Sequence, residues 1–460
     1  MLLTESRVLP AFCLLTTFLA SGGVINGWGP LHSNLVASTA LSEGQLQLAN
    51  DLAGIALSVG SLIFGVMIDH CGVRAVAALG LVLAALGYAL LALSDGAVLV
   101  TAGFSLVTGG GIAPYLATMA LANMAGSDAE EQRGRRSRAA MLVSLNSACF
   151  NLAGFNFSVL NWLPAASPAA ARRAFFLGYC ALALALGAGA LLLLPRRHRA
   201  AVASGGGGAG EGGEGSGKGG SEQPLLAGCA PEEAPLTAAS APAAATTTLW
   251  AEARAAPLAA TALFFGVSQL VGTWLGGALP DLVAQKGRAE GVPPSTYEGV
   301  YVDYLLPALT SAPALLLNPL AGAFVARHSF GVAFALANTL ALATVALALL
   351  PSLEAQAATF FVSTARNAVF FTAFFTFLSE GTRAPHYGSL VAVCTGVAAV
   401  LGFAVVPIIA LAGKHYSPVL WACVATLLLC YAQPVLLLRS EVGEGGCQGA
   451  AASVGKVKPR

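Results

Sequence analysis

The chain has 460 residues, of which 56% are hydrophobic and only 10% charged, and its formal net charge at pH 7 is +1. A soluble domain carries about a quarter charged residues, so this composition excludes an ordinary soluble globular protein. The near-zero charge, with no basic stripe of interleaved aromatics, argues against nucleic acid as a partner.

Apolar runs long enough to cross a bilayer recur along the chain. A span needs about 20 apolar residues, because the hydrocarbon core is roughly 30 Å thick and a helix rises about 1.5 Å per residue. The sequence therefore predicts an all-α membrane protein with twelve transmembrane helices in two six-helix bundles. The predicted spans lie near 8–31, 47–68, 75–94, 98–123, 138–162, 174–194, 257–280, 301–325, 331–350, 357–379, 387–412 and 418–438.

A stretch of different composition separates the two sets of spans. Residues 200–250 are rich in glycine, alanine and proline and cannot bury enough apolar surface to offset their chain entropy, which predicts a disordered linker. The linker divides a first half at 1–199 from a second half at 251–440, and a flexible tail follows at 441–460. Carriers built from two repeats of this kind bind their substrate between the halves.

Lysine and arginine favour one orientation of the spans. They are more frequent in the loops after spans two, four and six and in the tail than in the opposing loops, which predicts cytoplasmic termini and a cytoplasmic linker. We expect a multi-pass protein of the plasma membrane, with an organellar membrane as the alternative. Its nine cysteines are odd in number and form no CxxC or Cys/His cluster, so neither a metal site nor a cofactor is expected.

The most specific motif follows span two and runs from Gly65 to Arg74. Gly65 permits close helix packing, Gly72 permits a tight turn, and Asp69 can cap the next helix or form a charged latch with Arg74. The spacing resembles the loop signature of the major facilitator superfamily, which has a glycine, an acid, a second glycine and a basic residue. The resemblance implies the major facilitator fold, alternating access and a gating loop at Gly65, Asp69, Gly72 and Arg74; a monomer suffices for transport in that fold.

Four short stretches carry a narrower resemblance. They are similar to solute-carrier family 43, which comprises sodium-independent carriers of large neutral amino acids and an equilibrative purine nucleobase carrier. The stretches are Asn26–Leu31, Gly109–Ile112, Phe264–Leu270 and Pro385–Leu390.

Arg366 is the sharpest single candidate for substrate binding. Span ten places it near the bilayer midplane, where an arginine costs several kcal/mol unless it is paired or hydrated. We expect it to face the central cavity and bind a carboxylate bidentately, with a structural partner on a neighbouring span as the alternative.

Other candidates are polar side chains within spans, and glycines that expose backbone groups or let helices pack closely. An amide in a membrane serves either a polar cavity or bonds between helices. The candidates are Asn26, Gly27, Trp28, Gly29, Gly110, Gly111, Asn146, Asn151, Gln269, Thr273 and Asn367.

The pattern of acids and motifs bears on mechanism. Ion-coupled carriers usually place a carboxylate within the membrane, and the sequence has none at mid-depth, which favours facilitated diffusion. No HExxH, GxSxG or paired-acid motif points to an enzyme or to catalytic residues. The leading hypothesis is a uniporter for a small-molecule substrate, a neutral amino acid. The alternatives are a nucleobase or another small metabolite carried by the same fold, or a receptor that does not transport.

Overall fold

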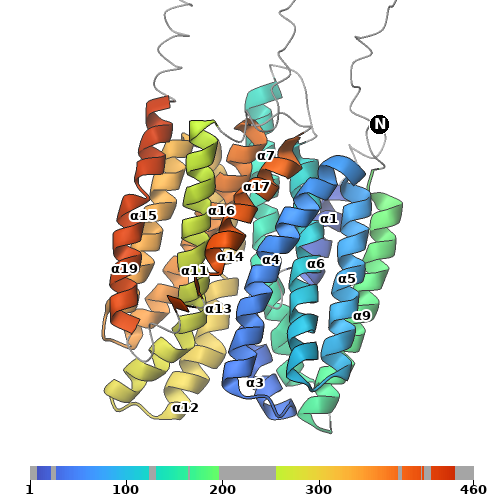
Figure 1. Cartoon of the computed structure of the whole chain (residues 1–460), viewed down its shortest axis with the longest axis vertical. Coiled ribbons are helices and arrows are strands. Elements are labelled where there is room, and N and C mark those ends of the chain that lie inside the picture. Colours follow the sequence, from blue (N-terminus) through green and yellow to red (C-terminus); the bar gives the residue numbers. More distant parts are fainter. Residues whose placement is uncertain are drawn as a thin grey trace, which may run out of the picture.

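The computed structural model describes residues 8–21, 27–123, 131–163, 166–195, 255–381, 386–405, 407–408 and 416–440. Helices make up these residues, and no strand occurs among them. The predicted linker, the predicted tail and Asn26 lie outside the described residues. Figure 1 shows the helices running roughly along one axis, with the blue-to-green first half beside the yellow-to-red second half.

The first half consists of long helices together with two short elements, η1 and α8. The segment Ser42–Gln45 starts one of the long helices with a capping box, in which the Ser42 hydroxyl accepts from the Gln45 amide and the Gln45 side chain accepts from the Ser42 amide. The elements are α1 (Val8–Ala20), α3 (Trp28–Ser38), α4 (Glu43–Cys71), α5 (Val73–Leu93), α6 (Ala97–Asn123), α7 (Glu131–Leu152), η1 (Ala153–Ser158), α8 (Val159–Trp162) and α9 (Pro168–Leu193).

The second half repeats this organisation. Residues 432–440 are also helical and follow α19 after a turn. The elements are α11 (Ala256–Ala289), α12 (Pro294–Thr296), η2 (Tyr297–Leu305), α13 (Leu306–Ser311), α14 (Ala314–Arg327), α15 (Phe330–Leu349), α16 (Glu354–Gly381), α17 (Tyr387–Gly402) and α19 (Tyr416–Leu429). We call the end of the bundle at which α9 ends and α11 begins the linker side, and the opposite end the far side (Figure 1).

Nine helical stretches within the described ranges are long and apolar enough to cross a membrane. Two shorter apolar helices, α1 and α17, occupy the positions of the predicted spans one and eleven. Span one differs from the single helix predicted over 8–31, because α1 stops at Ala20 and a new helix begins at Trp28. Pro30 lies in the first turn of that new helix, where its missing N–H leaves no bond unmade.

Span eight is also interrupted, and proline explains one break. Its helical path runs through the π-helix η2 and then turns at Pro313 before α14. Pro313 has no N–H to donate to the carbonyl of Leu309 four residues earlier. The Thr364 hydroxyl of α16 donates to that carbonyl instead, at 2.9 Å. The uniform helix predicted over 301–325 therefore becomes a series of shorter pieces.

An ion pair between a buried arginine and an exposed aspartate fixes the far side of the first half. Arg172 lies in α9 with its side chain fully buried, and its guanidinium donates to Asp95 between α5 and α6. The Arg172 hydrogen bond holds the pKa of the exposed Asp95 carboxyl below its usual value. The pair ties the start of α9 to the α5–α6 turn.

Candidate functional site

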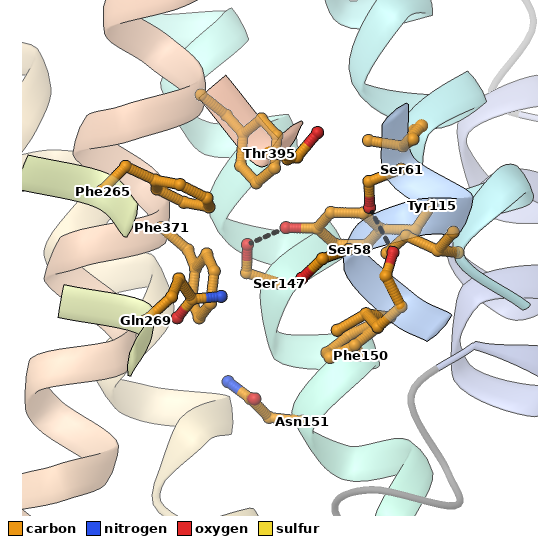
Figure 2. Close-up of a pocket in the computed structure, with 14 residues that line it drawn as sticks. Ser58, Ser61, Tyr115, Ser147, Phe150, Asn151, Phe265, Gln269, Phe371 and Thr395 are labelled. Atoms are coloured by element: carbon orange, nitrogen blue, oxygen red, sulfur yellow. Dashed lines mark hydrogen bonds between the residues drawn. The ribbon is translucent and has the colours of Figure 1, made fainter. Parts of the chain in front are cut away.

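A cavity of about 50 Å³ lies between the two halves near the middle of the long helices. Ser58, one of its lining residues, is close to the midpoint of the 29-residue α4. Helices α4, α6 and α7 of the first half and α11, α16 and α17 of the second half line the cavity (Figure 2). The lining residues are Leu57, Ser58, Ser61, Ile112, Tyr115, Leu116, Ser147, Phe150, Asn151, Phe265, Gln269, Phe371, Phe375 and Thr395.

Two amides in the lining, Asn151 and Gln269, set the polarity of this mostly apolar cavity. Asn151 comes from the last turn of α7 and Gln269 from α11, so each half contributes one (Figure 2). Neither side chain has a hydrogen-bond partner among the described residues, although other buried amides nearby are bonded. An amide without a hydrogen-bond partner in an apolar environment destabilises the protein by roughly 1–3 kcal/mol. A ligand that bonds to Asn151 and Gln269 would remove this cost.

Two hydroxyl groups of the lining are already engaged within their own helices. Ser61 donates to the Leu57 carbonyl at 2.8 Å, and Thr395 donates to the Val391 carbonyl at 2.9 Å. Such bonds within a helix let serine and threonine sit in a membrane span without a partner from another helix. This self-sufficiency explains why no sequence motif pointed to these lining residues.

Aromatic rings close the cavity towards the linker side. Tyr115 of α6 meets Phe375 of α16 edge-on, with ring centroids 5.5 Å apart, and this contact joins the two halves. Tyr115 also packs on Phe150 at 5.0 Å and shares a hydrogen bond of 3.1 Å with Ser147 (Figure 2). No sequence motif identified Tyr115, whose role depends on the neighbouring half.

A second closure lies nearer the linker side and involves the motif residues. The Asp69 carboxylate at the end of α4 accepts from the Gly388 amide at 3.0 Å and from the Ser389 amide and hydroxyl, both at 2.6 Å. We call these bonds the Asp69 clasp. Asp69 and Arg74 form no ion pair, so the partner of Asp69 is the start of α17 in the other half. The predicted Asp69–Arg74 latch is absent from this conformation.

The glycines of the motif act as the sequence predicts. Gly72 lies between α4 and α5 and has a φ of 83°, a backbone conformation that residues other than glycine rarely adopt. Gly65 lies directly against α17, and a Cβ atom added to it would stand 2.6 Å from the Gly388 carbonyl. Close contact at Gly65 and Gly388 brings Asp69 within reach of the α17 amides.

The halves also touch on the far side of the cavity. Thr273 lies one turn beyond Gln269 on α11, and its methyl group would be 3.6 Å from a Cβ atom added to Gly54 of α4. The cavity has room for only a few water molecules. A larger solute therefore requires the halves to separate.

Arg366 lies behind the cavity wall and is not among the lining residues. Its guanidinium is buried and donates to the Ser268 carbonyl at 2.6 Å and to the Asn367 side chain at 2.7 Å. It also lies over the Phe370 ring, 4.8 Å from the centroid. Arg366 and Asn367 thus pair with each other, and the guanidinium ties α16 to α11.

The remaining predicted candidates serve helix packing in the first half. Asn146 accepts from Thr17 at 2.7 Å and donates to the Tyr115 carbonyl at 3.2 Å, which links α1, α6 and α7. A Cβ atom at Gly110 would lie 2.6 Å from the Gly80 carbonyl, and one at Gly111 would lie 2.7 Å from the Ala20 carbonyl. The structure therefore places these residues against neighbouring helices.

The predicted residues around Trp28 lie at the start of α3. Gly27 precedes that helix, Trp28 begins it and Gly29 follows within its first turn. The Trp28 ring packs edge-on against Phe104, with centroids 5.6 Å apart. Of the predicted binding residues, the structure brings only Asn151 and Gln269 together at the cavity.

Comparison with known proteins identifies the fold of the chain through solved structures. No protein-family model and no curated protein matches the chain. Solved structures do match: the human organic anion transporter MFSD10 (TETRAN) superposes with a TM-score of 0.60 and 16% sequence identity, covering 94% of this chain and 99% of that one. The proton:xylose symporter XylE of the major facilitator superfamily, bound to 6-bromo-6-deoxy-D-glucose, gives 0.57 and 14%, covering 92% and 95%.

These matches extend over nearly the whole chain and bear out the predicted fold class. The narrower resemblance to solute-carrier family 43 stays a prediction, because these two structures share only 16% and 14% of their residues with this chain. The chain is a multi-pass membrane protein with the major facilitator fold, twelve helices arranged in two six-helix bundles.

Proposed function

We propose that this protein carries a small, uncharged organic solute across a bilayer by alternating access. The observation that carries the proposal is the pair of unpaired amides, Asn151 and Gln269, which face one cavity from opposite halves. A solute that bonds to both amides links the halves and relieves their unpaired state. Binding is then coupled to the relative position of the halves, as alternating access requires.

Contacts between the halves on both sides of the cavity support the transport cycle. The Asp69 clasp and the Tyr115–Phe375 contact join the halves on the linker side, while on the far side α11 approaches α4 at Thr273 and Gly54. We infer that solute enters when the far-side contact opens and leaves when the clasp breaks. No carboxylate lines the cavity in the described part of the chain, which supports facilitated diffusion.

A nucleobase is the cargo that the cavity favours. Phe265, Phe371 and Phe375 offer ring faces on which a flat heterocycle can stack, and the amides of Asn151 and Gln269 can each donate and accept along its edge. Because Arg366 is outside the lining, recognition here rests on uncharged groups. From the sequence, a nucleobase is the alternative to a neutral amino acid.

A neutral amino acid is the second candidate, and one observation favours it. Arg366 has no acidic partner among the described residues, so its guanidinium keeps capacity to bind a carboxylate. In that case the guanidinium must leave the Ser268 carbonyl and turn into the cavity. The phenylalanines would then surround the amino acid side chain.

Uptake into liposomes containing the purified protein separates these cargoes. We expect radiolabelled adenine to enter and excess adenine to compete better than excess leucine, because the lining offers amides and ring faces rather than an ion pair. Preferential competition by leucine would favour the amino acid. Absence of carrier-mediated uptake of any small solute would contradict transport itself, and accumulation driven by an imposed proton or sodium gradient would contradict facilitated diffusion.

Removing one cavity amide should weaken binding. Gln269→Leu deletes a hydrogen bond to the solute and is expected to raise the KM for uptake by roughly tenfold, since such a bond is worth about 0.5–1.5 kcal/mol and the unsatisfied solute group adds to the loss. The matched control is Gln356→Leu, because Gln356 is a buried glutamine that donates to the Ser352 carbonyl just before α16, away from the cavity. An equal rise of KM in both variants would contradict the role of Gln269.

A further inference from the structure

Arg366 is a buried charge without a counter-ion in the described part of the chain. Its side chain is 6% exposed, and the two acceptors of its hydrogen bonds, the Ser268 carbonyl and the Asn367 side-chain oxygen, are uncharged. A guanidinium stays protonated in proteins even when it is buried. Because the surroundings have a low dielectric constant, its positive potential reaches farther than it would in water.

The guanidinium lies one layer behind the cavity wall on the side of α11. Ser268, which accepts from Nη2, immediately precedes Gln269 in the lining. Phe370, beneath the guanidinium, stacks on Phe265 of the lining with ring centroids 5.4 Å apart and planes 10° from parallel. Only uncharged residues come between Arg366 and the cavity along these two routes.

No ionised side chain of the described chain lines the cavity itself. Within the lining, no charge of opposite sign cancels the potential of Arg366. A cation entering the cavity meets a repulsion, and an anion or an electron-rich carbonyl edge meets an attraction. This discrimination does not require direct contact between the guanidinium and the solute.

We propose that Arg366 determines charge specificity: it makes the cavity reject cations and favour neutral or anionic organic solutes. The proposal rests on the cavity being the solute site of the proposed function, but it concerns the sign of the charge that the site accepts. It also agrees with the proposed facilitated diffusion, because a proton or sodium ion at the site would face the same repulsion.

Three planar compounds of nearly equal shape test this specificity. At pH 7 benzamide is neutral, benzoate is an anion and benzamidine is a cation. The purified full chain in detergent is titrated with each compound, and the apparent Kd follows from the rise in melting temperature. This measurement needs no transport, so failure of the proposed function in the uptake assay is distinguishable from failure of charge selection. We expect benzoate and benzamide to bind on the order of tenfold more tightly than benzamidine.

Two variants remove the potential in different ways. Arg366→Gln deletes the charge, while Asn367→Asp keeps the arginine and places a carboxylate where Asn367 now accepts from Nη1 at 2.7 Å. In either variant the ratio of the benzamidine and benzoate Kd values should fall to within about threefold. Asn367→Asp preserves shape, so it provides the test if Arg366→Gln does not fold.

The matched control is Arg288→Gln, which removes the same charge from an exposed position on the same helix as Gln269. It should leave the ratio unchanged, because exposed charges are screened by salt. Benzamidine binding as tightly as benzoate to the wild type would overturn the proposal. So would an unchanged ratio in the folded variants, or an equal fall in Arg288→Gln.

Discussion

Replacing Asp69 with asparagine is expected to lower the maximal uptake rate at least tenfold. The carboxylate accepts three hydrogen bonds from Gly388 and Ser389, and a charge-assisted bond contributes about 1.5–3 kcal/mol. An asparagine side chain turns an N–H₂ group towards backbone donors and loses the charge. A loss of about 3 kcal/mol shifts the equilibrium away from closure on the linker side by roughly a hundredfold.

The shift can be measured independently of flux. Ala392 lies in the contact between α17 and α4, 3.1 Å from a Cβ atom added to Gly65, so an Ala392→Cys reporter becomes reachable by a thiol reagent when this contact opens. We expect faster labelling of the reporter when Asp69→Asn is present. Asp281→Asn is the control, since Asp281 accepts from Tyr416 within the second half at 2.9 Å. Unchanged labelling and uptake in Asp69→Asn would rule out a gating role for the clasp.

A single methyl group at Gly388 should have an effect of similar size. In Gly388→Ala the new Cβ atom would overlap the Gly65 carbonyl and stand 2.7 Å from the Asp69 carboxylate, so α4 and α17 must move apart. Overpacking of this kind typically costs about 1–3 kcal/mol, and displacement of the clasp adds to it. We expect uptake to fall tenfold or more and the Ala392→Cys reporter to label faster.

The same helix provides the control for this change. Gly402, at the end of α17, has no atom within 4 Å of an added Cβ atom, so Gly402→Ala makes the same chemical change without a clash. It is expected to transport at the wild-type rate and to melt at or slightly above the wild-type temperature, because alanine favours helix more than glycine does. Equal uptake by Gly388→Ala and Gly402→Ala would contradict the close approach of the halves at Gly388.

The Gly65–Arg74 motif shows which features local sequence can predict. The positive φ of Gly72 follows from the short connection between α4 and α5, so spacing alone predicts it, whereas the neighbour of Gly65 is α17 of the other half. The partner of Asp69 lies 320 residues away at Ser389, and no feature of the loop points to it. The nearby Arg74 was the natural local partner, and only the docking of α17 decided otherwise.

The same division holds for the polar residues within spans. Asn146 and Asn151 are the same residue type and lie five residues apart on one helix. Asn146 nevertheless bonds to α1 and α6, while Asn151 faces the cavity. Which face of a helix meets a neighbour depends on its rotation in the bundle. The sequence predicted Arg366 as buried but could not predict that Ser268 and Asn367 would hold it behind the cavity wall.

The sequence by itself determined the membrane environment, the helical class and the approximate positions of the spans. These follow from local properties, because backbone groups in hydrocarbon must bond within each helix and each helix must match the bilayer thickness. Only the tertiary structure decided where the cavity lies, which amides face it and how the halves close. Those features depend on contacts between helices distant in the chain, such as Tyr115 with Phe375 and Asp69 with Ser389, because two faces become neighbours only when the bundles pack.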